Sequence, residues 1–276
     1  MNILSNPFII SAFFAAILAS FASGVIGSYV VVKRIVFISG SIAHSVLGAM
    51  GLFLYLQRVY GLSFASPLLG ALFGSIISSL VIGFVSLRFS ARKDALIASV
   101  WSTGMAIGVI FISLTPGYNT ELLNFLFGNL LWTTTGDLWM LLSLDLLLLF
   151  CISAFYQQFL LVCFDEKQAR LKGLSTEFWY LFLLVLIGLS IVVLIQVMGV
   201  VLVITLLSLP AMVASLFTKK FFTMMLLSSL FALTFSILGI TVSYQLNLPI
   251  GSTIAIVAAL FYASSLFLQN SYRTKH

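Results

Sequence analysis

The sequence predicts an all-α polytopic membrane protein with about eight or nine transmembrane helices and one short re-entrant or interfacial helix. The chain has 276 residues, of which 62% are hydrophobic and only 7% are charged. Water-soluble domains carry about 25% charged residues, so this composition excludes a soluble exterior. The apolar runs are about 20 residues long, which is the length of a membrane-crossing helix and about twice that of a barrel strand.

Short polar segments separate the apolar runs that we expect to cross the membrane. These runs cover residues 8–32, 35–56, 64–87, 95–114, 138–163, 176–197, 200–217, 221–244 and 250–268. The stretch 121–132 is too short to span the bilayer, so we expect it to form the re-entrant or interfacial helix. Almost no loop separates the sixth and seventh runs, which predicts a tight helical hairpin at 197–199. We expect one permease domain over residues 1–276, with no separate soluble domain.

The basic residues predict the orientation of the chain in the membrane. The formal net charge is +6, but Lys and Arg stand singly or in pairs between the apolar runs, which argues against nucleic acid as a partner. An excess of Lys and Arg marks cytoplasmic loops, and here every second loop carries it, with Arg58 alone on the other side. Nine crossings then place the N-terminus outside and the C-terminus in the cytoplasm. The residues assigned to the cytoplasm are Lys33, Arg34, Arg88, Arg92, Lys93, Lys167, Arg170, Lys172, Lys219, Lys220, Arg273 and Lys275.

The apolar segment from Lys33 to Tyr55 carries His44 near its middle. His44 lies nine residues after Ile35, or about 14 Å along a helix that rises ~1.5 Å per residue. Ionisable residues inside a membrane are costly and usually functional. Imidazole suits zinc, iron and related ions, so one interpretation is a transient metal ligand. A neutral histidine hydrogen-bonded to a neighbouring helix and a proton relay are the alternatives.

Small residues around His44 predict that other helices approach it closely. They recur at helical spacing as Ser41, Ser45, Gly48 and Ala49. The pairs Gly70/Gly74 and Gly104/Gly108 have GxxxG spacing, which indicates close packing of the third and fourth runs. Because His44 is the one histidine within these runs, passage of a metal fits it better than storage.

Three acidic residues are candidates for attracting a cation. Asp145 lies in the run LLSLDLLLLF, where a carboxylate should face the bundle interior or a water-filled cavity. It either attracts cations on the path, or it is protonated or paired. Glu121 and Asp137 flank the short 121–132 stretch and could form an acidic mouth on the exterior side, or be ordinary solvated loop residues.

The main cytoplasmic feature is the charged segment from Cys163 to Glu177. Its charges alternate in sign, and residues 165–172 can form a short helix that ends at Gly173, a residue favoured after a helix C-terminus. It could dock another protein or be a solvated loop. The sequence has no GxxxxGK[ST] phosphate loop, so uphill transport would need a partner motor or an ion gradient.

In order along the chain, five segments resemble the membrane subunits of metal-importing ABC transporters, the family that handles zinc, manganese or iron. They read SYVVVKRIVFISGSIAHSVLGAMGL, DALIASVWSTGMAIGVIF, TELLNFLFGNLLW, FDEKQARLKGL and VMGVVLVITLLSLPAMVASLF. The resemblance covers roughly residues 10–260. Its most specific parts are the histidine segment, the LFGN motif at 126–129 and the LSLPA motif at 207–211.

The resemblance implies a role for several residues. His44 matches a histidine on the translocation path, and Glu121 matches a position that is often acidic. Many members place an aspartate four residues before the histidine, but Gly40 stands there in this chain, which puts the identity of the metal in doubt. Asp145 matches no motif of the family. The loop 165–173 matches the coupling helix that docks on the ATPase, which involves Asp165, Glu166, Lys167, Arg170 and Gly173.

The resemblance also implies partners and a location. These are a cytoplasmic ATP-binding subunit, an extracytoplasmic metal-binding protein, and a second permease copy or a paralogue, in the bacterial cytoplasmic (inner) membrane. The chain would hold no permanent cofactor, and its own residues would not hydrolyse ATP. Two alternatives stay open: a secondary transporter coupled to an ion gradient, and an ABC permease for a metal chelate.

Overall fold

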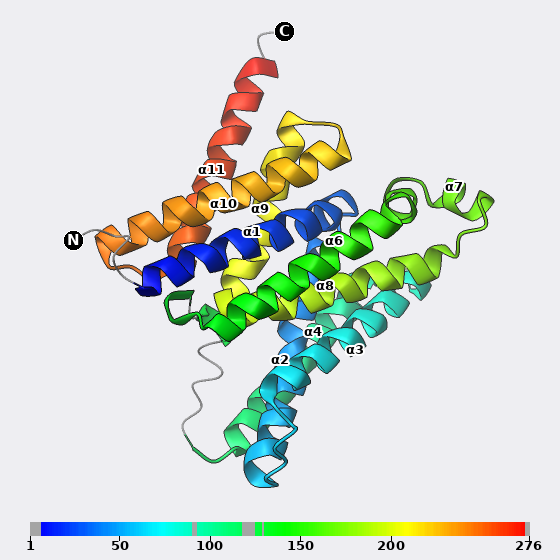
Figure 1. Cartoon of the computed structure of the whole chain (residues 1–276). Coiled ribbons are helices and arrows are strands. Elements are labelled where there is room, and N and C mark those ends of the chain that lie inside the picture. The colour runs from blue at the N-terminus through cyan, green and yellow to red at the C-terminus, as the bar shows by residue number, and fades with distance from the viewer. Residues whose placement is uncertain (1–6, 90–92, 118–124, 129, 274–276) are drawn as a thin grey trace. The chain divides into compact units, whose positions relative to one another are not determined.

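The computed structural model describes residues 7–89, 93–117, 125–128 and 130–273 (Figure 1). This part of the chain is helical and contains no strand, and nine of its helices are long and apolar enough to cross a membrane. An all-α polytopic membrane protein is therefore confirmed. The nine helices are α1 (Pro7–Val32), α2 (Val36–Val59), α3 (Pro67–Arg88), α4 (Lys93–Leu114), α6 (Thr135–Phe164), α8 (Thr176–Met198), α9 (Val200–Phe217), α10 (Phe221–Leu246) and α11 (Ile250–Arg273).

The short stretch before α6 is partly described. Residues 125–127 are helical, and η2 (Leu130–Trp132) is a single 3₁₀ turn. The expected helix at 121–132 begins outside the described residues, and Glu121 lies there too. Part of the expected short helix is thus present, immediately before the longest helix of the described chain.

Helix α6 begins three residues earlier than its apolar run suggested, because a capping box extends it. The Asp137 carboxylate accepts hydrogen bonds from the backbone N–H of Thr134, at 2.9 Å, and from its hydroxyl, at 2.8 Å. In return, the Thr134 hydroxyl accepts from the Asp137 N–H, at 3.2 Å. This reciprocal pair satisfies two N–H groups that a helix start leaves unpaired. Asp137 is therefore a helix-capping residue, a role that neither sequence interpretation of its carboxylate included.

The described helices divide into two compact units, each built from separate stretches of chain. The first unit comprises Met1–Val32, Leu126–Leu147 and Leu194–His276, and the second comprises Lys33–Phe125 and Leu148–Val193. Two of the four boundaries fall inside α6 and α8, and the stretches alternate along the chain, so the units are not consecutive domains. The expectation of one permease domain stays a prediction.

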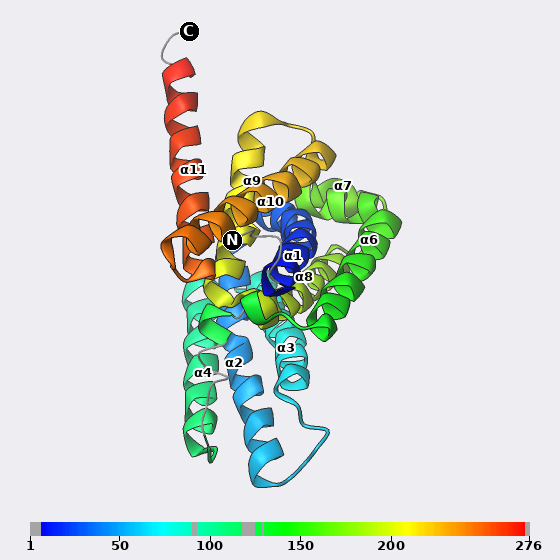
Figure 2. The same cartoon turned by 60° about the vertical axis from the view of Figure 1, so that its left-hand side comes forward.

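In the second unit, α2 packs between α3 and α4 (Figure 2). On the α4 side, glycines let the two backbones meet. A Cβ added at Gly48 would lie 2.8 Å from the Gly104 carbonyl oxygen, and one added at Gly51 would lie 2.7 Å from the Gly108 carbonyl oxygen. The GxxxG pair of α4 and the small residues after His44 therefore form one interface, as the spacing predicted.

The second GxxxG pair faces α2 from the other side. A Cβ added at Gly74 of α3 would lie 2.6 Å from the Ala49 Cβ, and one added at Gly70 would lie 2.7 Å from the Ala49 carbonyl oxygen. Close packing of α3 is thus also confirmed. Helix α2, which carries His44, is thus packed closely against α4 on one face and against α3 on another, because small residues stand at both contacts.

In the first unit, α1 packs against α9 and α10, and α9, α10 and α11 pack against one another. Aromatic rings also join α1 to α10: those of Tyr29 and Phe221 meet edge to face with their centroids 4.7 Å apart. Gly239 of α10 admits α11, since a Cβ there would lie 2.6 Å from the Ile254 Cα. This unit is also assembled by close backbone approach.

Candidate functional site

His44 lies on α2 with its imidazole stacked on the indole of Trp101 from α4. The ring centroids are 4.8 Å apart and the planes differ by 11°. The Trp101 Nε1–H donates to the Met105 sulfur at 2.9 Å, which holds the indole in place one turn along the same helix. The Gly48–Gly104 contact fixes the register of the two helices. The imidazole is therefore positioned by packing on an aromatic face.

The Nδ1 atom of His44 is buried, and no hydrogen-bond partner for it exists in the described part of the chain. A buried polar atom without a partner is unfavourable, and a bound metal ion would satisfy its lone pair. The His44 residue as a whole is half-buried. This arrangement leaves a nitrogen donor for a passing cation, which favours the transport interpretation over a histidine fully bonded to a neighbouring helix.

Gly40 lies one turn before His44, where an acid would face the same side of the helix. A Cβ at Gly40 would meet nothing within 4 Å, so the position has room for a side chain. Among the described residues, no group of three or more His, Cys, Asp or Glu side chains could hold a metal ion. Within the described part of the chain, His44 is thus not part of a cluster of three or more such side chains.

Asp145 lies on α6 in the first unit, whereas His44 lies in the second. The two residues therefore do not belong to one site within a single unit. Asp145 is only 7% exposed, and its Oδ1 has no hydrogen-bond partner among the described residues. Its role as a cation-attracting group stays a prediction.

The short helix expected after the fifth apolar run is present as α7 (Glu166–Leu171). At its start, the Asp165 carboxylate accepts from the Gln168 N–H at 2.9 Å, which is an N-cap. At its end, Gly173 has φ +76°, and the Leu174 N–H reaches the Ala169 carbonyl at 3.1 Å. The Gly173 N–H bonds the Arg170 carbonyl at 2.9 Å, which completes a Schellman motif.

These contacts divide the residues expected to dock a partner into those that shape α7 and those that are exposed on it. Asp165 and Gly173 shape the helix ends, and the Arg170 Nε donates to the Thr176 hydroxyl at 3.3 Å, which ties α7 to α8. Lys167 is exposed, and Leu171 is 88% exposed. Sequence reasoning missed Leu171, although an apolar residue in a charged segment was the available signal. An exposed leucine beside a lysine is suited to a protein partner.

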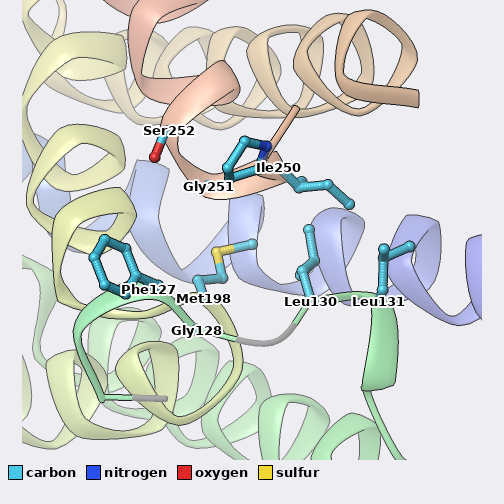
Figure 3. Close-up of a pocket in the computed structure, with 9 residues that line it drawn as sticks. Phe127, Gly128, Leu130, Leu131, Met198, Ile250, Gly251 and Ser252 are labelled. Carbon is cyan, nitrogen blue, oxygen red and sulfur yellow. The ribbon is translucent and has the colours of Figure 1, made fainter. Parts of the chain in front are cut away.

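A cavity of about 440 Å³ lies in the first unit, where three turns meet (Figure 3). The segment before η2, the α8–α9 junction and the start of α11 line it. Figure 3 shows the Met198 side chain between the Phe127–Leu131 segment and the start of α11. The lining residues are Phe127, Gly128, Leu130, Leu131, Met198, Pro249, Ile250, Gly251 and Ser252.

Two glycines make this junction possible. One residue, Gly199, separates α8 from α9, with φ +77° and ψ 158°, a conformation that is nearly restricted to glycine. A Cβ on Gly199 would overlap the Gly128 backbone nitrogen, and one on Gly128 would overlap the Met198 carbonyl. Sequence reasoning identified 126–129 and 197–199 separately but not their contact, because backbone contacts between remote turns have no residue pattern.

Contacts within each unit bring together helix ends that the sequence predicts on the same side of the membrane. The three turns at the cavity all belong to loops predicted outside. In the second unit, Lys33 contacts Glu166 of α7, and Tyr180 of α8 donates to the Ser86 hydroxyl near the end of α3, at 3.4 Å. All of these lie at helix ends predicted to be cytoplasmic. Each unit thus gathers loops of one predicted side at one end.

Comparison with known proteins identifies the family. A model of the ABC 3 transport family matches residues 5–269. A probable metal transport system membrane protein of Chlamydia pneumoniae is 46% identical over 264 residues, which is 96% of this chain and 90% of the relative. The manganese transport system membrane protein MntC of Listeria innocua is 32% identical over 267 residues, 96% of this chain and 92% of the relative.

A solved structure supports the same assignment. The structure of PsaBC from Streptococcus pneumoniae in complex with Fab matches with a TM-score of 0.85 and 27% identity. The match covers 99% of this chain and 97% of the other. Helix order, packing and sequence therefore agree along nearly the whole length, and the chain belongs to the ABC 3 transport family as one of its metal-transport permeases.

Proposed function

We propose that this chain is the permease of an ABC importer that moves a divalent transition metal into the cytoplasm. The observation that carries the proposal is His44, whose buried Nδ1 has no hydrogen-bond partner among the described residues. It is positioned on Trp101 in a helix clamped by close neighbours. A single strong donor binds a metal weakly enough to release it, as a transport path requires.

Three partners supply the functions that this chain does not provide by itself. No phosphate loop occurs in the sequence, so a cytoplasmic ATP-binding subunit supplies the energy, docked on Lys167 and Leu171 of α7. An extracytoplasmic binding protein delivers the metal to the exterior end. A second permease copy or a paralogue lines the other side of the path. The location is the bacterial inner membrane, with the C-terminus in the cytoplasm.

Two observations point to different metals. Relatives whose names specify manganese transport include the Listeria protein, which favours manganese. Carboxylate ligands suit manganese, whereas imidazole suits zinc and iron, and Gly40 removes the carboxylate nearest to His44. The side-chain chemistry therefore weighs toward zinc or iron, and the names of the relatives toward manganese.

Uptake by the complete complex in proteoliposomes tests both the mechanism and the metal. With binding protein, ATPase and ATP present, we expect labelled metal to accumulate, and accumulation should stop when ATP is replaced by a non-hydrolysable analogue. Competition among manganese, zinc and iron identifies the preferred ion. Gradient-driven accumulation by the chain alone would overturn the proposal in favour of a secondary transporter. ATP-dependent uptake of a metal chelate but of no free ion would favour a chelate permease.

A further inference from the structure

Lys33 occupies the turn that joins α1 to α2, three residues before α2 begins. Its Nζ donates to the Val162 carbonyl near the end of α6, at 2.8 Å. The same atom pairs with Glu166 Oε1, the first residue of α7, at 2.5 Å. It also lies 5.7 Å from the ring centroid of Tyr180 on α8. One ammonium group thus binds the start of α2 to three other elements of the same unit.

The two partners differ in their exposure. The Lys33 side chain is 15% exposed and that of Glu166 is 48% exposed. Ion pairs in free contact with water contribute little, but Lys33 is largely covered and its bond to a backbone carbonyl orients it. Exposed Arg34 next to it is free to act as a topology signal. The contacts of Lys33 therefore indicate a structural link between helices in addition to a charge at the surface.

The Lys33–Glu166 pair connects α7, the proposed docking helix, to α2, the helix that carries His44. Glu166 directly precedes Lys167, the exposed charge on α7, and Lys33 precedes His44 by eleven residues, about three turns along a helix of 3.6 residues per turn. Helix α2 is interlocked with α4 through Gly48 and Gly104, so a shift of α2 carries His44 and its neighbour together. A displacement of α7 would pull on α2 through this contact.

We propose that the Lys33–Glu166 pair transmits motion of α7 to α2, and so sets the position of His44 during transport. Lys33 and Glu166 are positioning residues, since neither touches the metal. The inference rests on the proposed function, in which α7 docks on the ATP-binding subunit, and it names the route from that docking surface to the metal path. The pair would raise the number of metal ions moved for each ATP hydrolysed.

The test measures metal uptake and ATP hydrolysis together in the full complex. Lys33→Gln and Glu166→Ala should each lower the metal-to-ATP ratio by about 2- to 30-fold, the range in which residues between coupled sites change their coupling. The complex should still co-purify. Lys33→Arg, which keeps the charge and donors, should retain most of the coupling. The double variant should be no worse than the poorer single variant, because one shared contact is lost.

Matched controls separate this inference from the proposed function. Arg34→Gln removes a charge from the same turn and should leave the ratio unchanged. Lys167→Glu with Leu171→Asp should weaken co-purification of the ATPase; an intact complex would contradict docking on α7 and leave the pair to be judged by the ratio alone. An unchanged ratio in both Lys33→Gln and Glu166→Ala would overturn the link. Loss of the complex in Glu166→Ala but not in Lys33→Gln would also overturn it, since Glu166 would then bind the ATPase directly.

Discussion

The two compact units use the same packing device but place their polar groups differently. In the second unit, glycine contacts bring α4 against α2 next to the stacked rings of His44 and Trp101, and the Lys33–Glu166 pair lies near the start of α2. In the first unit, Gly128 and Gly199 meet at a junction whose cavity is lined almost wholly by apolar side chains. The comparison teaches that close backbone approach occurs beside a buried polar group in one unit and beside an apolar cavity in the other.

This contrast predicts different effects of mutations on transport and on stability in the two units. Substitution of the polar side chains of the second unit, such as His44, should reduce transport while leaving stability nearly unchanged. Substitutions at the glycine junction of the first unit should reduce stability first. A stable first-unit variant without transport, or an unstable His44 variant, would contradict the division.

The largest effect is expected for Gly199→Ala. The backbone there has φ +77°, which costs an alanine about 1–3 kcal/mol, and the new Cβ would overlap the Gly128 backbone, adding about 1–3 kcal/mol of overpacking. We expect a marked fall in the Tm of the purified protein in detergent. Gly173→Ala is the matched control, because φ there is +76° but no atom lies within 4 Å of the added Cβ. Equal losses of Tm at both positions would show that the junction contact adds nothing.

The next largest effect is expected for His44→Ala, measured as initial uptake of labelled metal by the complete complex. Even residues that only support a metal ligand change affinity or activity by about 10- to 100-fold, so loss of the ligand should cost at least as much. Membrane insertion and Tm should stay close to those of the parent chain, since the residue is half-buried and the helix is held by its glycine contacts. Normal uptake would remove His44 from the path and leave the second unit without its functional centre.

The smallest effect is expected for Gly40→Asp. The open space at Gly40 accepts a side chain, and the new carboxylate would lie one turn from His44 as a second ligand. Because carboxylates suit manganese, competition assays should show a shift toward manganese, with Tm unchanged. Gly48→Asp is the control: a Cβ there would meet the Gly104 carbonyl at 2.8 Å, so this variant should lose stability. An unaltered metal preference in a stable Gly40→Asp protein would show that position 40 does not face the path.

The sequence alone determined the class of fold and most of its elements. Nine apolar runs of spanning length, basic residues in alternate loops and GxxxG spacing are local properties, and each follows from the cost of placing polar groups in hydrocarbon. The short helix at 165–172, with Gly173 after it, was also predictable, because capping depends on residues close in sequence. His44 was found because an ionisable residue in an apolar run is rare.

Tertiary structure alone decided which distant residues meet. It placed Trp101 on His44, Lys33 on Glu166 and Gly128 on Gly199. It also showed that Leu171 of α7 is 88% exposed. None of these pairings follows from periodicity, because in a membrane nearly every helix face is apolar and the choice of neighbour depends on the fit of small residues and backbone.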